Sequence, residues 1–141
     1  MPRKSGHKKS TIPVFHDDIK KLAKKNLSFR KPICTGTFSE LVVISILPMA
    51  ELGEETHDHA DEILFIVEGE GELTFRGRTE SASKHDAIFV PAGQLHNLKN
   101  IGERDLKLIS VFSPPPSGAD TPVHRAGAKT VEEQMRYAWE M

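Results

Sequence analysis

The pattern of apolar and polar positions predicts a chain built mainly of short strands. Between residues 35 and 114, apolar or alternating runs are separated by Gly, Pro, Asn and Asp, which is typical of β structure. The expected strands cover residues 41–47, 63–67, 73–75, 87–90, 95–100 and 105–112. Because no long helix intervenes between these runs, the pattern indicates an all-β sandwich or barrel.

The run at residues 63–67 has no polar position. A strand of this kind is expected to be covered on both faces, by the barrel interior on one side and by a second sheet, an N-terminal strand or a partner subunit on the other. Residues 68–71 follow with two glycines and 73–75 return as an apolar run, so we predict a hairpin here.

Helical patterns occur only near the two ends of the chain. Residues 17–26 read DDIKKLAKKN, for which we predict a short helix capped by Asp17. Thr130 and Glu133 form a capping box for a second helix, after a proline-rich stretch. The expected division is therefore a basic arm and short helix (1–34), a barrel (35–114), and a proline-rich segment with a C-terminal helix (115–141).

The charge is distributed unevenly, although the net charge is only −1. Residues 1–31 hold ten Lys or Arg against two Asp, which gives +8, and the remainder holds nine against eighteen acidic residues, which gives −9. A solvated arm explains this better than nucleic-acid binding does, since the arm is too short for a helix-turn-helix domain. Nucleic acid is therefore not an expected partner.

The compartment is predicted from cysteine usage and from the N-terminus. Cys34 is the single cysteine, so the chain forms no internal disulfide, which fits a reducing compartment. No apolar stretch follows the basic N-terminus, and no run reaches the length of about 20 residues that a membrane helix needs. We expect a cytoplasmic protein with no membrane association.

The stretch ETHDHADEILFIVEGEGE, residues 55–72, sets ionisable side chains against an apolar run. In a strand, His57 and His59 would share one face, and a bend between Ala60 and Asp61 would bring Glu62 to the same side. Buried imidazoles and carboxylates are costly unless they are paired or bound to metal. An inward-facing ligand from a neighbouring strand would complete the site.

That ligand is expected in residues 91–100, PAGQLHNLKN. Pro91 and Gly93 end one strand, and His96 begins the next. The predicted metal site is a three-histidine, one-carboxylate set. Its members are His57, His59, Glu62 and His96.

These residues resemble the two sequence motifs of the cupin superfamily. The first motif is Gly53, His57, His59 and Glu62, followed by Gly69, and the second is P-x-G-x-x-H-x-x-x-N from residue 91 to residue 100. The flanking segments are similar to small single-domain cupins described as mannose-6-phosphate-isomerase-like. The resemblance implies a double-stranded β-helix barrel with short terminal helices, usually a homodimer, with a divalent metal on the four residues of the predicted set.

The chain departs from the family pattern at three places. Gly53 precedes the first histidine by three intervening residues rather than five. The gap from His59 to Glu62 is one residue shorter than usual, so Asp61 is the alternative carboxylate ligand. His85 stands where a glycine normally opens the second motif.

Such a site would bind iron, manganese, zinc or nickel, with the identity left open by the sequence. It could polarise an oxygen ligand or activate bound water or dioxygen. We favour an enzyme of oxygenase, isomerase or lyase type acting on a small oxygen-rich molecule. The alternative is a non-catalytic cupin that binds metal and a small, sugar-like ligand. The sequence alone places no phosphate-binding Arg or Lys near the site.

Overall fold

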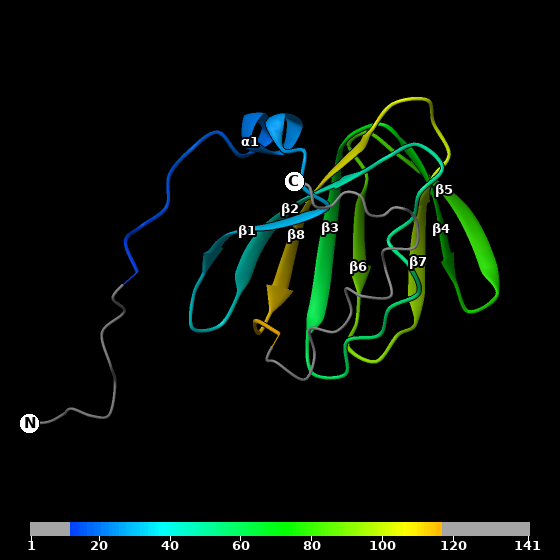
Figure 1. Ribbon diagram of the computed structural model, residues 1–141. Helices are drawn as coiled ribbons and strands as arrows, with labels where there is room; N and C mark the ends of the chain where they lie inside the picture. Colours follow the sequence, from blue (N-terminus) through cyan, green and yellow to red (C-terminus); the bar gives the residue numbers. More distant parts are fainter. Residues whose placement is uncertain (1–11, 117–141) are drawn as a thin grey trace, which may run out of the picture.

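The computed structural model describes residues 12–116, which form one short helix and eight strands (Figure 1). The helix is α1 (Ile19–Lys25). The strands are β1 (Arg30–Thr35), β2 (Glu40–Ile46), β3 (Asp61–Glu68), β4 (Glu70–Phe75), β5 (Arg78–Ser83), β6 (Ala87–Val90), β7 (His96–Asn100) and β8 (Leu106–Ser113). Every strand predicted from the sequence is present, although β1 and β5 were not predicted.

The strands form two antiparallel sheets. One has the order β1-β2-β8-β3-β6 and the other has the order β5-β4-β7. Figure 1 shows the three-stranded sheet beside the five-stranded one, with β6 and β7 near each other. This arrangement confirms the predicted all-β architecture.

The core lies between the two sheets because alternate residues of each strand point inward. In β3, the buried positions Glu62, Leu64 and Ile66 share this inward face, and only the first is polar. The cluster that they join is apolar and well buried, and includes Val42, Ile44, Ile46, Leu52, Leu73, Leu98, Leu106, Leu108 and Phe112. A carboxylate at the edge of such a core requires a partner.

The hairpin predicted at residues 68–71 is wrong. β3 pairs with β6 and β8, whereas β4 pairs with β5 and β7, so the chain passes from one sheet to the other at Gly69. This glycine has a φ of +103°, and a Cβ there would lie 3.0 Å from the Leu106 Cα. The true hairpin joins β4 to β5 through Arg76 and Gly77, both with positive φ as in a type I′ turn.

Helix α1 covers one end of the outer face of the five-stranded sheet. Its Ala23 is fully buried and packs with Val43 and Val67. The N-cap is Asp18, whose side chain accepts a hydrogen bond from the Lys21 amide, and not Asp17 as predicted. Asp17 lies one residue too early, and its carboxylate accepts from the amide of Asp18 instead.

The remainder of that outer face is only partly covered. Leu41, Val111, Ile63 and Phe89 are successive cross-strand neighbours on β2, β8, β3 and β6, and Phe89 is 61% exposed. Phe65, on the same outer face of β3, is 41% exposed. The prediction that β3 is covered on both faces therefore holds within the described chain only where α1 packs.

The expected C-terminal helix that begins at Thr130 lies outside the described residues, as does most of the basic arm. The division of the chain at residues 34 and 114 stays a prediction. Among residues 12–116, no helix has the length and apolar character needed to cross a membrane.

Candidate metal centre

Four ionisable side chains meet at one end of the core. They are Glu55, His57, Glu62 and His96, and one ligand atom from each lies within 4.8 Å of the others. All four residues are buried, at 3% exposure or less. Two carboxylates and two imidazoles at such separations form a potential metal-binding set.

Backbone pairing between distant segments places these side chains. Glu55 and His96 exchange both backbone hydrogen bonds, at 2.9 and 3.1 Å, as an isolated antiparallel bridge. His57 follows two residues after Glu55, and its carbonyl accepts a hydrogen bond of 2.9 Å from the Gly93 amide. Glu62 occupies the inward position near the start of β3. The turn at Pro91 and Gly93 therefore orients both halves of the site.

The distances between the ligand atoms suit a small divalent ion. His57 Nε2 lies 3.2 Å from Glu55 Oε1 and 3.4 Å from Glu62 Oε1. His96 Nε2 lies 3.5 Å from Glu62 Oε1 and 3.9 Å from Glu55 Oε1. A tetrahedral ion with ligands at about 2.1 Å separates those ligands by about 3.4 Å. The four side chains could converge on an ion with little movement.

Two of the converging atoms have no hydrogen-bond partner among residues 12–116, although they are fully buried. These atoms are Glu62 Oε1 and His96 Nε2. Buried polar atoms without hydrogen-bond partners are rare in folded proteins, and coordination to a bound ion is one recognised explanation for them. The orphaned atoms therefore fit a metal at the point where they meet.

In three of the four clustered residues, the second side-chain oxygen or nitrogen, which points away from the cluster, contacts a neighbouring group. Ser110 Oγ donates to Glu62 Oε2 at 2.7 Å, Arg30 Nη2 donates to Glu55 Oε2 at 3.0 Å, and His96 Nδ1 lies 3.0 Å from the Gln94 carbonyl oxygen. Such outer contacts fix the orientation of metal ligands and, for histidine, the tautomer. The near atoms are thus left directed at one another.

Phe112 forms the apolar wall of the site. The His57 ring meets it edge-on, with centroids 4.9 Å apart, and the Arg30 guanidinium lies 5.7 Å from its centroid. Phe112 therefore packs against the ligand His57 and also against Arg30, the arginine that holds Glu55. A low-dielectric wall strengthens the interactions among the charges beside it.

Proton affinities in the site are shifted strongly. Burial lowers the pKa of His57, but its hydrogen bond to Glu55 and its close ionic contacts with Glu55 and Glu62 together outweigh burial and raise it to about 9. The pKa of His96 is also raised, because its contact with Glu62 outweighs burial. Burial raises the pKa of Glu62, but its contacts with both histidines outweigh burial and hold it well below the usual range. In the absence of metal, His57 therefore holds a proton at neutral pH, and the pKa of His96 is shifted in the same direction.

The structure brings three of the four sequence-predicted ligands together and leaves one outside. His57, Glu62 and His96 belong to the cluster. His59 is exposed in a turn at residues 58–59, so the prediction that it shares a strand face with His57 is wrong. Its role as a ligand stays a prediction, without support from this arrangement. Asp61, the alternative carboxylate, accepts a hydrogen bond from the Ala92 amide at 2.9 Å and is not part of the cluster.

Glu55 is the residue that sequence reasoning missed. The sequence did contain an indication that Glu55 takes the place of His59: the gap between His59 and Glu62 is one residue shorter than usual in the family. Counting the alternating pair from Glu55 and His57 instead leaves four residues before Glu62. The alternation argument was sound, but it was applied two residues too late.

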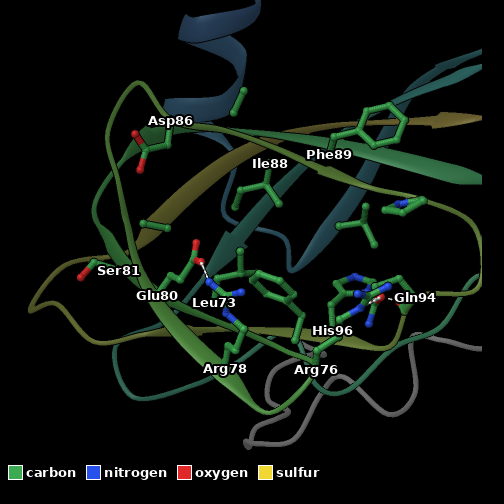
Figure 2. A pocket seen from close by; sticks show the side chains of 15 residues that line it. Leu73, Arg76, Arg78, Glu80, Ser81, Asp86, Ile88, Phe89, Gln94 and His96 are labelled. Atoms are coloured by element: carbon green, nitrogen blue, oxygen red, sulfur yellow. Dashed lines mark hydrogen bonds and ion pairs between the residues drawn. The ribbon is translucent and has the colours of Figure 1, made fainter.

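A cavity of about 480 Å³ reaches the candidate metal centre at His96 (Figure 2). It is lined by residues of β4, β5 and β6 and by the turn before β7. Polar side chains on its wall include Arg76, Arg78, Glu80 and Gln94. Its size is in the range typical of small-molecule sites.

Comparison with known proteins gives one family and several relatives. The model of the Cupin domain matches residues 42–112. An uncharacterized protein of Methanocaldococcus jannaschii is 34% identical over 79% of this chain and 94% of its own length, and YrkC of Bacillus subtilis is 32% identical over 83% and 66%. The crystal structure of BH2720 from Bacillus halodurans has a TM-score of 0.72 at 33% identity, covering 76% of this chain and 86% of that one.

Other relatives match over shorter segments. The mannose-1-phosphate guanylyltransferase of Salmonella montevideo is 31% identical over 50% of this chain but only 15% of its own length. The polyketide synthase CurC of Streptomyces cyaneus is 24% identical over 54% of its length. The chain thus spans two thirds or less of several curated relatives that it matches.

Proposed function

The chain belongs to the cupin family, and from this premise we propose that it is an enzyme holding one divalent metal ion on Glu55, His57, Glu62 and His96. Its substrate would be a small oxygen-rich molecule bound in the cavity beside the ion, and its reaction of oxygenase, isomerase or lyase type. The double-stranded β-helix provides the rigid support for this site.

One observation carries the proposal: the four ligand atoms converge while two of them, on Glu62 and His96, lack any hydrogen bond. A purely structural ion-pair network would be expected to satisfy its members. The cavity gives a second reason, because His96 is both a member of the cluster and part of the cavity wall. A ligand in the cavity would reach the ion directly.

When bound, the ion would supply Lewis-acid chemistry or activate an oxygen ligand. Imidazole and carboxylate together suit iron, manganese, zinc and nickel. The chain's own residues supply orientation, since Ser110 and Arg30 fix the two carboxylates. Phe112 excludes water from one side of the site, and the mouth of the cavity admits the substrate from the other.

The proposal is tested by elemental analysis of the purified, untagged protein. We expect about one divalent ion per chain. His96→Ala and Glu55→Gln should each lose most of it while the circular dichroism spectrum is kept. Wild-type protein that contains no ion, and that takes up none when titrated with zinc, manganese or iron(II), would refute the metal centre.

His59→Ala is the matched variant, because it removes an imidazole two residues from His57. We expect it to retain its metal, since His59 is exposed and lies outside the cluster. Loss of metal from His59→Ala together with retention in Glu55→Gln would restore the ligand set first predicted from the sequence. The pair of variants therefore separates the two assignments.

A non-catalytic binding protein is the second candidate. It is favoured by the cavity carboxylates, both of which are already engaged: Glu80 lies 3.5 Å from Arg78, and Asp86 accepts a hydrogen bond from the Ser83 amide at 2.8 Å. Because both carboxylates already have partners, neither is placed to serve as a general base for a substrate. Incubating the metal-loaded protein with a panel of sugar acids, enols and diols, and following product by mass spectrometry, decides between them: product from any substrate establishes the enzyme.

A further inference from the structure

We propose that the cavity beside the metal centre selects a small anion, a molecule with a carboxylate or phosphate group, and that Arg76 binds this group. This inference rests on the proposed function, because it defines the substrate class of the same site. The cationic residue that the sequence could not place near the site is supplied by the turn between β4 and β5.

The position of Arg76 follows from strand pairing. Phe75, the last residue of β4, lies opposite His96, the first residue of β7. Arg76 follows immediately in the turn, and its φ of 51° carries the chain into β5. Figure 2 shows Arg76 and His96 close together at one end of the cavity, both lining it.

Gln94 holds the guanidinium in place. Its side-chain amide donates to the Leu95 carbonyl at 2.8 Å, which leaves Gln94 Oε1 free to accept from Arg76 Nε at 3.1 Å. The Gln94 carbonyl oxygen is also the partner of His96 Nδ1. One residue thus positions a metal ligand through its backbone and Arg76 through its side chain.

Within residues 12–116, the two terminal nitrogens of Arg76 have no hydrogen-bond partner, so they are available for a ligand. Among the described residues, Gln94 is the hydrogen-bond partner recorded for this side chain, and it uses only Nε. A guanidinium held at Nε presents its remaining donors as a planar fork, which matches the two oxygens of a carboxylate or phosphate. The side chain is exposed to the cavity mouth, so an incoming anion can reach it.

The charges around the cavity also favour an anion. Glu55 and Glu62 cancel the two charges of a divalent ion, which leaves Arg30 and Arg76 as positive charges near the centre. Arg78 is balanced by Glu80, at 3.5 Å and well exposed. Figure 2 shows Asp86 at the far end of the cavity from Arg76. Because Arg30 leaves the metal-loaded centre with one net positive charge, an anion placed between this centre and Arg76 would meet positive charge on both sides.

The test is isothermal titration calorimetry on zinc-reconstituted protein, whose zinc content is measured for every variant. The probes are malonate, inorganic phosphate and malonamide, which is the neutral counterpart of malonate. Wild-type protein should bind one or both anions and bind malonamide much more weakly. Arg76→Gln should retain its zinc and bind the preferred anion at least about tenfold more weakly, as expected for the loss of a charged hydrogen bond. Preference for malonate or phosphate identifies the anionic group.

Arg104→Gln is the matched control, because it removes the same charge from an exposed position outside the cavity lining. It should bind like the wild type. Equal affinities of Arg76→Gln and wild type, binding of malonamide as tight as malonate, or no anion binding by zinc-loaded wild type would each overturn the proposal. If the protein takes up no zinc, this refutes the proposed metal centre but does not by itself refute the anion site. The same titration on the metal-free protein must then still show the loss in Arg76→Gln, or the anion site fails as well.

Discussion

At the scale of single residues, the chemistry of the centre depends on how each ligand atom is prepared by its neighbour. The carboxylate of Glu62 is anchored by Ser110 and that of Glu55 by Arg30, while Gln94 orients His96. These contacts use the far atom of each ligand and leave the near atom for the ion. Their removal should weaken the site without dismantling the fold.

The proton affinities predict a pH dependence with a definite sign. A pKa of His57 raised from its ordinary 6.5 to about 9 means that protonated His57 stabilises the metal-free protein fully below about pH 6.5, and that this contribution is lost as the pH rises through 9. The lowered pKa of Glu62 contributes stability above its ordinary 4.5 and loses it as the pH falls further. The melting temperature of the metal-free protein should therefore fall between pH 6.5 and 9.

Bound metal should reverse this trend, because it requires neutral imidazoles. The rise in melting temperature on adding zinc should grow from pH 6 to pH 8.5, and calorimetry in buffers of different ionisation enthalpy should show that protons, including that of His57, are released on zinc binding at pH 7. His85→Asn, at an exposed turn, should behave like the wild type. A zinc-induced increment that does not depend on pH would contradict the assigned roles of His57 and His96.

Ser110→Ala is expected to reduce zinc affinity about 10- to 100-fold, as is typical when the outer partner of a metal ligand is removed. The reason is that Glu62 Oε2 loses its 2.7 Å hydrogen bond and the carboxylate can rotate. Competition with a chelating dye measures the change. Ser113→Ala, which removes an exposed hydroxyl bonded to the Phe38 carbonyl, should leave the affinity unchanged. Similar affinities for the two variants would show that Ser110 does not position the ligand.

At the scale of elements, the passage from β3 to β4 decides which sheet each strand joins. Gly69 makes this passage in a conformation with φ of +103°, and a Cβ there would lie 3.0 Å from the backbone of both Asp105 and Leu106. That backbone would have to shift by a few tenths of an ångström, which is harder than moving the end of a flexible side chain. The crossing therefore requires glycine for two separate reasons.

Gly69→Ala should thus destabilise the protein more than Gly77→Ala. Gly77 also has a positive φ, of +72°, but an added Cβ there meets no atom within 4 Å. We expect the difference in the free energy of unfolding to be at least about 2 kcal/mol, which is the usual scale for steric conflict in a packed interior. Urea denaturation of both variants measures it. Equal losses would mean that the backbone near Leu106 relaxes freely.

At the scale of the whole molecule, the outer face of the five-stranded sheet has a covered part and a more exposed part among the described residues. Helix α1 packs at one end, where Lys107 donates to the Asn26 carbonyl at 2.6 Å and ties the helix end to β8. The rest of the face presents the row of Leu41, Val111, Ile63 and Phe89, with Phe65 beside it. An apolar row that crosses four strands is typical of an association surface.

The homodimer expected from the family resemblance is therefore predicted to use this face. Phe65→Glu should convert the dimer to a monomer in size-exclusion chromatography with light scattering, because it would place a charge within the apolar contact. Phe38→Glu, which changes an exposed phenylalanine outside this sheet face, should remain dimeric. A monomeric wild type, or a Phe65→Glu variant that remains dimeric, would exclude this interface.

Local pattern alone indicated six of the strands and three members of the buried cluster. The apolar runs ended by Gly and Pro located six strands, and the histidines beside them indicated His57, Glu62 and His96. The strand predictions succeeded because period-two alternation and turn chemistry act within a few residues. The proline and glycine before His96 could be read in the same way, since they end β6 and permit the turn.

Only the tertiary structure decided which carboxylate joins the histidines and what lies beside them. The turn at residues 58–59 leaves His59 exposed and outside the cluster. The backbone bridge between Glu55 and His96 places Glu55 inside it. Arg76 meets the centre because β4 pairs with β7, and β4 belongs to the second sheet because the chain crosses at Gly69. Each of these outcomes depends on pairing between segments far apart in the chain, which alternation along a single strand does not specify.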